Sequence, residues 1–276
     1  MILRFALALV FSAIIPCVFA ADIAAHKGSA QFLDGKIVCV SIFADDESSS
    51  WGKARVSPYA KKTVDYMKIA TKWISKKARK FERKPEFVHD FFGNGGIFYR
   101  TKFDCDMTDN AIASKFVWRY IERAIDLGWI RKTYGTDNIF FVVFLNTGKK
   151  NRVHSRAQCY CGKSAYPYEI VYINRYVDGI ETSPAAYAHE ILHVFGAEDL
   201  YCADSLNNFP SEFVAYCAET YPNDIMFTIN DKFRGSIYDK ITNDFSDIDA
   251  YYVGFLSECA EVTRFSLHPS EHLPQN

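Results

Sequence analysis

Residues 188–199 read Ala188-His189-Glu190-Ile191-Leu192-His193-Val194-Phe195-Gly196-Ala197-Glu198-Asp199. His189 and His193 are four residues apart, and on a helix such residues lie one above the other on the same face. Both imidazoles can therefore face one metal ion. Gly196 can adopt the left-handed conformation that ends a helix and reverses the chain, and this reversal can return Asp199 to the same ion.

The chemistry of these residue types predicts a catalytic zinc site. Two neutral histidines and one carboxylate fill three tetrahedral positions around Zn²⁺ and leave the fourth to water, as in catalytic rather than structural sites. Glu190 lies next to the first histidine, where its carboxylate can reach a metal-bound water. We therefore expect His189, His193 and Asp199 as metal ligands and Glu190 as the catalytic base. The alternative is an ordinary core helix whose histidines are only hydrogen-bonded.

The sequence around the motif is suited to a helix. Ser183 is a residue type that caps helix N-termini, and Pro184 suits the first helical position. No helix breaker occurs between Pro184 and Phe195. The helix is therefore expected to begin at Pro184 and to end at about Gly196.

The motif resembles that of the metzincin metallopeptidases, which continues through glycine to a third ligand. Aspartate at the third position resembles the snapalysin-type branch, and the same offset favours Asp199 over Glu198 as the ligand. The family also has a methionine turn beneath the metal, and here the turn-forming stretch Tyr221-Pro222-Asn223-Asp224-Ile225 leads to Met226. The resemblance covers about residues 183–226. It implies that Met226 is the Met-turn residue, although a methionine here can also be plain core filler.

The resemblance also implies a fold. We expect an α+β protein with a metzincin-like, two-lobed single domain over residues 21–276. The upper lobe, about 21–196, would contain a mixed sheet and helices. The lower lobe, about 197–276, would be mostly irregular and end in a helix, with the active cleft between the lobes.

The first residues predict export. Met1 to Ala20 has a basic Arg4, an apolar run and a small-residue cleavage site, which is typical of a secretory signal peptide. No later segment has the length of apolar sequence that a membrane span needs, so no transmembrane segment is expected. A net charge of −1 argues against a nucleic-acid partner. The mature protein is expected to be secreted or periplasmic.

Cysteines are frequent for an exported chain and predict disulfide bonds. Of the eight cysteines, Cys17 leaves with the signal peptide, so the mature chain has an odd number. At least one thiol is then free or intermolecular. Cys202 and Cys217 flank the segment after Asp199, and a bridge between them would stiffen that segment.

Hydrophobic periodicity predicts the remaining elements. Strands are expected at Lys36–Phe43, Phe87–Phe92, Ile97–Phe103, Ile139–Asn146 and Glu169–Asn174, and helices at Tyr59–Arg83, at Thr108–Leu127 with Gly128 as its stop, and near the C-terminus after Ser246 or Asp247. The family resemblance implies that the Glu169–Asn174 strand is an edge strand that binds extended substrate. The Tyr59–Arg83 helix has a basic face, which we interpret as a solvated surface or as a contact for an anionic polymer or membrane.

These features together predict an exported zinc endopeptidase that hydrolyses peptide bonds with a zinc-bound water activated by Glu190. Its partner would be a protein or peptide substrate. Two other hypotheses remain open: a non-catalytic zinc-binding interaction protein on the same scaffold, and a zinc hydrolase of non-peptide amides.

Overall fold

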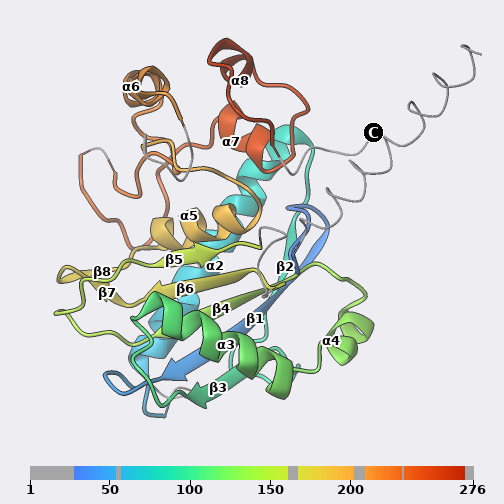
Figure 1. Ribbon diagram of the computed structural model, residues 1–276, viewed down its shortest axis with the longest axis vertical. Helices are drawn as coiled ribbons and strands as arrows, with labels where there is room; N and C mark the ends of the chain where they lie inside the picture. The colour runs from blue at the N-terminus through green and yellow to red at the C-terminus, as the bar shows by residue number, and fades with distance from the viewer. Residues whose placement is uncertain (1–27, 54–56, 161–166, 202–208, 232, 271–276) are drawn as a thin grey trace, which may run out of the picture.

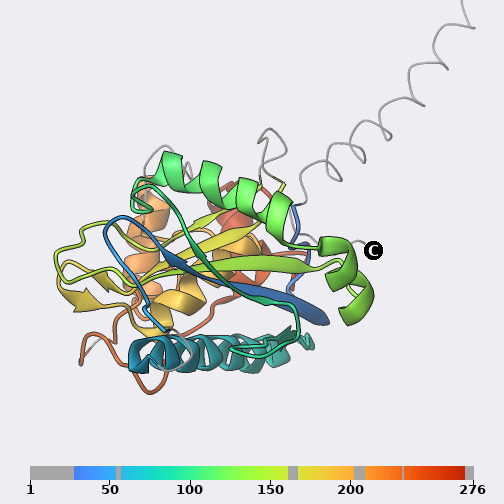
Figure 2. The same ribbon diagram turned by 90° about the horizontal axis from the view of Figure 1, so that it is seen from below.

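The structure, a computed structural model, describes residues 28–53, 57–160, 167–201, 209–231 and 233–270. The expected signal peptide, Met1 to Ala20, lies outside the described residues. The described chain is a mixed α+β protein in which a twisted sheet separates two layers of helices (Figures 1 and 2). No described helix combines the length and apolar character needed to cross a membrane.

The main sheet is mixed, as the sequence predicts. Its strand order is β2-β1-β4-β6-β5, and β3 pairs with β1 beyond the end of β2. Every pairing is parallel except that between β5 and β6, which is antiparallel. The strands are β1 Lys36–Asp45, β2 Glu86–Val88, β3 Phe98–Lys102, β4 Ile139–Leu145, β5 Arg156–Gln158 and β6 Ile170–Asn174, and a separate hairpin joins β7 Tyr176–Val177 to β8 Ile180–Glu181.

The central strands are apolar throughout because helices cover both faces of the sheet. Successive side chains of a strand point to opposite faces. In β1, Ile37, Cys39 and Phe43 accordingly belong to one core, and Val38, Val40, Ile42 and Ala44 belong to the other. All seven residues of β4 are buried.

The two helical layers cover opposite faces of the sheet (Figure 2). Helix α2 (Pro58–Ala78), continued by the 3₁₀ turn η1 (Arg79–Phe81), packs with α5 (Pro184–Val194) on one face. Helices α3 (Asn110–Ala124) and α4 (Leu127–Tyr134) cover the other face. Tyr187 of α5 meets Tyr66 of α2 edge-on, with ring centroids 6.0 Å apart. Helix α5 is therefore held between α2 and the sheet.

Two expectations for the first half of the chain are wrong in detail. The helix predicted over Thr108–Leu127 ends earlier, at Ala124, and an additional helix, α4, begins at Leu127, so Gly128 lies inside α4 rather than ending a helix. Asp109 caps α3 with its side chain, because its carboxylate accepts from two backbone N–H groups of the first turn. Gly135, in the left-handed conformation at φ 66°, ends α4.

The expected edge strand is also misassigned. Residues 170–174 form β6, which lies inside the sheet between β4 and β5. The edge strand is β5, which is three residues long and lies within a stretch whose sequence is typical of a polar loop. Such a short, half-buried strand has too little periodicity to be recognised from its sequence.

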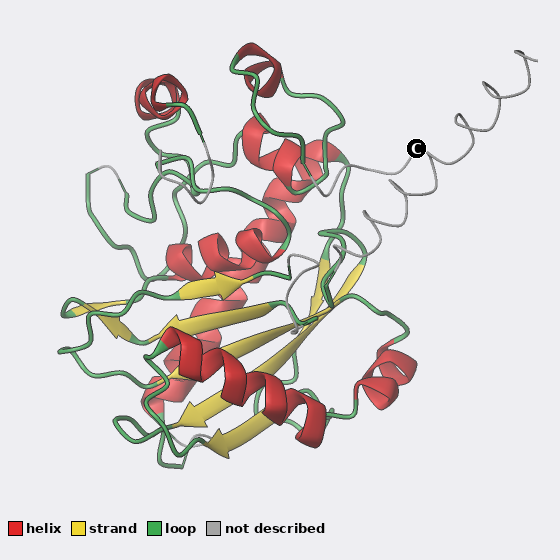
Figure 3. Ribbon diagram, in the orientation of Figure 1, coloured by secondary structure: helices red, strands yellow, loops and turns green. Residues whose placement is uncertain are grey.

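The C-terminal part contains more helix than expected (Figure 3). Its described residues contain three short helices, α6 (Ser211–Thr220), α7 (Asp247–Tyr252) and α8 (Ala260–Arg264). Ser246 caps α7 in a reciprocal capping box with Asp249, which agrees with one of the two predicted start points. The prediction had missed α6, whose buried residues are only Phe213 and Cys217.

Four described cysteines do not form disulfides. Cys39, Cys105, Cys217 and Cys259 are buried free thiols. The suggested partner of Cys217, Cys202, lies outside the described residues, so that pairing stays a prediction.

A buried pair of carboxyl groups connects α7 to the turn before Met226. Asp224 and Asp249 are each only 1% exposed. Asp224 accepts hydrogen bonds from the backbone N–H groups of Met226 (2.7 Å) and Ser246 (3.0 Å). Burial, then the charge of Asp224, raises the pKa of the Asp249 carboxyl well above its ordinary range. The pair therefore retains a proton that the unfolded chain would release.

This pair gives a testable dependence of stability on pH. An aspartate in the unfolded chain has a pKa of about 3.9, so above that pH the folded state binds the extra proton. The free energy of unfolding consequently falls as pH rises from about 4 toward the raised pKa of Asp249, by about 1.4 kcal/mol for each unit of pKa difference. Asp249→Asn replaces the shared proton by an amide N–H. We expect its urea midpoint to fall less between pH 4.5 and 7 than that of the unchanged protein.

The matched control is Asp247→Asn, an exposed residue of the same helix. Its urea midpoint should keep the pH slope of the unchanged protein. If Asp249→Asn also kept that slope, the shared proton would be disproved.

Candidate metal centre

Helix α5 presents the motif residues from a buried position. Its bounds, Pro184–Val194, match the prediction, and Ser183 has the extended backbone of an N-cap although its side chain makes no capping hydrogen bond. Phe195 packs edge-on against Phe140 of β4, with centroids 6.0 Å apart. Gly196 has φ 99°, so it makes the reversal that the sequence predicts.

The three expected ligands come together. The Nε2 atoms of His189 and His193 are 3.1 Å apart. Oδ1 of Asp199 lies 3.2 Å from Nε2 of His189 and 3.1 Å from Nε2 of His193. The three atoms thus form a nearly equilateral triangle, and among the described residues this is the group of histidine, cysteine and acidic side chains placed to hold a metal ion.

Backbone carbonyls fix which ring nitrogens face the centre of this triangle. Nδ1 of His189 is 3.0 Å from the carbonyl oxygen of Ile225, and Nδ1 of His193 is 2.7 Å from that of Ala197. A carbonyl oxygen only accepts, so each Nδ1 carries hydrogen and donates. In the neutral imidazole the Nε2 atoms then carry lone pairs. Two nitrogen lone pairs and a carboxylate oxygen therefore converge.

Such a group of acceptors requires a positive charge at its centre. Burial lowers the pKa of His193, but the hydrogen bond and charge of Asp199 outweigh it and raise that pKa to about 9. Burial likewise raises the pKa of Asp199, and its hydrogen bonds with both histidines more than reverse this, so the pKa falls well below the usual range. A bound proton or a metal ion can supply the charge.

The geometry fits a metal ion. Ligand atoms held tetrahedrally at about 2.0–2.1 Å from a zinc-sized ion are about 3.3 Å apart. The observed separations of 3.1–3.2 Å agree with that value to within about 0.2 Å. The hydrogen bonds from Nδ1 to carbonyls are the outer contacts that orient metal-binding histidines. His189, His193 and Asp199 can therefore hold a metal ion.

Glu198, the alternative ligand, faces another partner. Its Oε1 lies 3.5 Å from Nε2 of His268 in the C-terminal segment. It is not part of the converging group of ligand atoms. The structure thus favours Asp199 over Glu198.

Glu190 is buried beside the ligands. Burial raises the pKa of its carboxyl, while the neighbouring His189 and His193 partly oppose that rise. The backbone of Ala157, in the edge strand β5, hydrogen-bonds the same carboxyl. The edge strand therefore helps to position the predicted base.

Met226 is fully buried in the turn that also orients His189. Its backbone carbonyl accepts from the N–H of Leu200, 3.0 Å away, just after Asp199. The carbonyl of the preceding Ile225 is the one that receives Nδ1–H of His189. The turn thus contacts the ligand helix on one side and the Asp199 segment on the other.

Two further residues of the site were not identified from the sequence. Tyr201 is 50% exposed, and its ring lies nearly parallel to that of His189 at 6.4 Å. Arg156 of β5 lies over the ring of Tyr172 at 3.7 Å, and its charge interacts with Glu190. Only its position, two residues after Asp199, could have identified Tyr201 from the sequence. Arg156 had no such signal, because β5 was not recognised as a strand.

Comparison with models of known protein families gives no match, and no curated protein matches the sequence.

Removal of a single ligand should abolish tight metal binding. We expect the unchanged protein to bind one divalent ion per chain in equilibrium dialysis against zinc. His189→Ala, His193→Ala and Asp199→Ala should each lose it. An ion bound only to the folded state at one hundred times its dissociation constant adds about 2.7 kcal/mol of stability, so the unchanged protein should also melt at a higher temperature with zinc.

Glu198→Ala is the matched control for Asp199→Ala, because it removes the adjacent carboxylate. It should retain the ion and the thermal shift. Loss of metal from Glu198→Ala with retention in Asp199→Ala would contradict the assignment.

Proposed function

We propose that the protein is an exported, metzincin-like zinc endopeptidase. The observation that carries the proposal is the triangle formed by Nε2 of His189, Nε2 of His193 and Oδ1 of Asp199, with both imidazoles oriented by carbonyls. Two nitrogens and one oxygen suit zinc, and three protein ligands leave a position for water. Zinc bound there would lower the pKa of a water from about 15.7 toward roughly 7 and would polarise a substrate carbonyl.

Glu190 would accept the proton of the attacking water and later deliver it to the leaving amine. Both transfers require a carboxyl whose pKa lies nearer neutrality than that of an ordinary glutamate. Its burial supports this role, because burial raises its pKa. The hydrogen bond from Ala157 restricts the carboxyl to one position beside the ligands.

The edge strand β5 is the proposed place for the substrate backbone. It pairs on one side with β6 and forms one edge of the main sheet. An extended peptide can add to such an edge through main-chain hydrogen bonds. Because Ala157 of β5 bonds Glu190, a peptide bound along β5 would pass beside the proposed base.

Several other features support the metzincin-like assignment. The turn at Met226 contacts both the His189 helix and the segment after Asp199, as expected for a methionine turn beneath the metal. The chain after Gly196 forms a C-terminal part with short helices, which corresponds to the proposed lower lobe. Export, with residues 1–20 as the signal peptide, remains part of the proposal on the strength of the sequence alone.

Replacement of Glu190 tests the mechanism directly. Glu190→Gln keeps the size of the side chain but cannot accept a proton, so peptide cleavage should fall by on the order of a hundredfold or more. Zinc content should be unchanged, because Glu190 is not a ligand. Cleavage of a quenched fluorescent peptide and the zinc content of the same preparation measure both effects. Glu198→Gln is the control and should cleave normally; full activity in Glu190→Gln would exclude this mechanism.

Substrate choice separates the proposal from the two other hypotheses. Purified protein is incubated with casein and with cell-wall fragments, each with and without a chelator. Casein cleavage that the chelator stops supports the endopeptidase. Release of material only from cell-wall fragments would favour a hydrolase of non-peptide amides, and inertness toward both substrates would favour a non-catalytic zinc-binding protein.

A further inference from the structure

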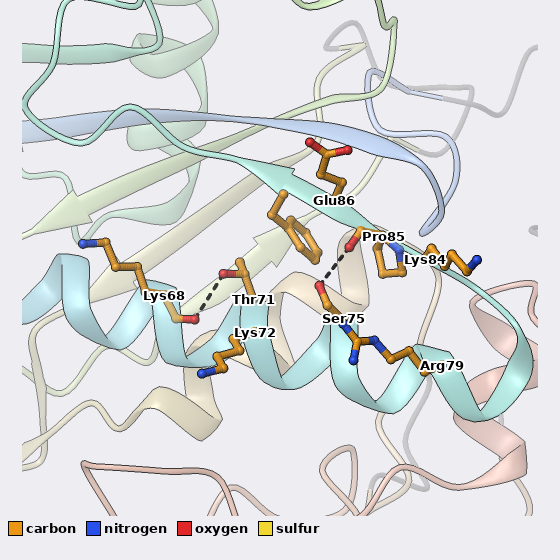
Figure 4. Close-up of a pocket in the computed structure, with 9 residues that line it drawn as sticks. Lys68, Thr71, Lys72, Ser75, Arg79, Lys84, Pro85 and Glu86 are labelled. Carbon is orange, nitrogen blue, oxygen red and sulfur yellow. Dashed lines mark hydrogen bonds between the residues drawn. The ribbon is translucent and has the colours of Figure 1, made fainter.

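A basic groove lies at the sheet edge opposite to β5. It is a cavity of about 680 Å³ between α2 and the segment 84–87, which leads into the other edge strand, β2 (Figure 4). Its charged lining consists of four cations and one carboxylate: Lys68, Lys72, Arg79, Lys84 and Glu86. We call this cavity the β2 groove. Its volume falls in the range of about 300–1,000 Å³ that is usual for ligand sites.

The helical part of the lining comes from a single face. Lys68, Lys72 and Arg79 are separated by four and seven residues, so they recur on one side of the helix and its 3₁₀ extension. Figure 4 shows Lys68 and Lys72 toward one end of the groove and Arg79 and Lys84 toward the other. The carboxylate of Glu86 points away from α2 in the same view. The positive charge is therefore spread along an elongated hollow.

These four cations lack the ion pairs that several neighbouring basic residues make. Around them, lysines and an arginine are neutralised by carboxylates from neighbouring elements, in the pairs Lys62–Glu181, Lys77–Asp244, Lys80–Asp247 and Arg83–Asp34. Within the described ranges, Lys68, Lys72, Arg79 and Lys84 make no such salt bridge. The groove cations are thus available to an external anion, as are Lys61 and Lys76 of α2 outside the groove.

A hydrogen bond ties the two walls of the β2 groove together. The hydroxyl of Ser75 donates to the carbonyl oxygen of Pro85 at 2.9 Å and so joins the helix to the strand (Figure 4). The hydroxyl of Thr71 donates to Met67 O at 3.0 Å. A groove with fixed walls loses little conformational freedom on binding.

Partly buried His89 lies beside the groove. Its Nε2 is 3.2 Å from the hydroxyl of Thr71, which lines the groove. Burial, and secondarily the positive charge of Lys68, lowers the pKa of His89 to about 4. The imidazole is therefore neutral at physiological pH and adds no positive charge to the groove.

We propose that the β2 groove binds an anion carrying several phosphate groups. A guanidinium matches a phosphate with paired hydrogen bonds, and lysines add point charges. Phosphate groups carry closely spaced negative charges, which complement cations at both ends of the groove better than a single carboxylate does. Because β2 and β5 are opposite edges of the sheet, the anion would leave the metal centre accessible.

The test is calorimetric titration with inorganic tripolyphosphate. Lys68→Ala combined with Lys72→Ala should weaken binding by on the order of tenfold or more, because charge-assisted hydrogen bonds are lost. The matched control is Lys61→Ala with Lys76→Ala, which removes the same charge from exposed positions of α2 outside the groove. The control should bind within about twofold of the unchanged protein. Equal weakening in both double variants, or no binding by the unchanged protein, overturns the proposal.

A second arm identifies the source of the phosphate groups. Vesicles of phosphatidylglycerol are floated with the protein, and vesicles of phosphatidylcholine are the control. The proposal is supported, with lipid headgroups as the source of the phosphate, by two results together. The protein is retained on phosphatidylglycerol vesicles and released by tripolyphosphate, and the Lys68/Lys72 variant is not retained. If the protein binds tripolyphosphate but is not retained on vesicles, the groove assignment is supported and the ligand is a soluble phosphate compound. Vesicle retention that persists in the Lys68/Lys72 variant overturns the assignment to this groove.

Two further measurements keep these results interpretable. Zinc binding by the Lys68/Lys72 variant should be unchanged, which shows that it is folded. His193→Ala protein, which is expected to bind no metal, should bind tripolyphosphate as the unchanged protein does. If it did not, the anion would be bound at the metal centre and the groove assignment would be wrong.

Discussion

The hydrogen bonds from Nδ1 of His189 and His193 to backbone carbonyls are the constraint on which the metal centre depends. They force both Nε2 lone pairs toward Oδ1 of Asp199, so that three acceptors lie within 3.2 Å of one another. Without a cation this arrangement is repulsive, and with one it is a ligand set. The two carbonyls belong to Ala197, just after the helix, and to Ile225, in a distant turn. The geometry of the centre is therefore a property of the folded chain and not of the helix alone.

The position of Ile225 depends in turn on buried polar groups. Asp224 receives the N–H groups of Met226 and Ser246, and Asp249 shares the buried site with it. This network joins helix α7 to the turn that orients His189. A pair of carboxyl groups taken out of water is costly unless one of them stays protonated. The C-terminal part of the chain is therefore coupled to the metal centre through a proton and a few hydrogen bonds, as well as through apolar packing.

The two edges of the sheet carry different chemistry. At one edge, β5 hydrogen-bonds Glu190 through Ala157 and is the strand where we propose that an extended peptide binds. At the other edge, β2 borders a groove whose basic side chains have no acidic partner among the described residues. Helix α2 connects the two, because its apolar face supports α5 and its basic face lines the groove. The metal centre and this basic groove thus lie on the same face of the sheet, toward its opposite edges.

The sequence by itself determined the local features of this protein. Spacing predicted helix α5 and the reversal at Gly196, and it selected His189 and His193, because helical periodicity and the conformational freedom of glycine are local properties. The resemblance to the metzincin motif was needed to choose Asp199 over Glu198. Continuous apolar runs likewise predicted β1, β4 and β6. Only the tertiary structure decided that β5 forms the edge of the sheet, that Ile225 orients His189, that Glu198 turns to His268, and that Tyr201 and Arg156 adjoin the site. Those outcomes depend on contacts between residues far apart in the chain, and a short strand or a backbone carbonyl has no signature in the sequence.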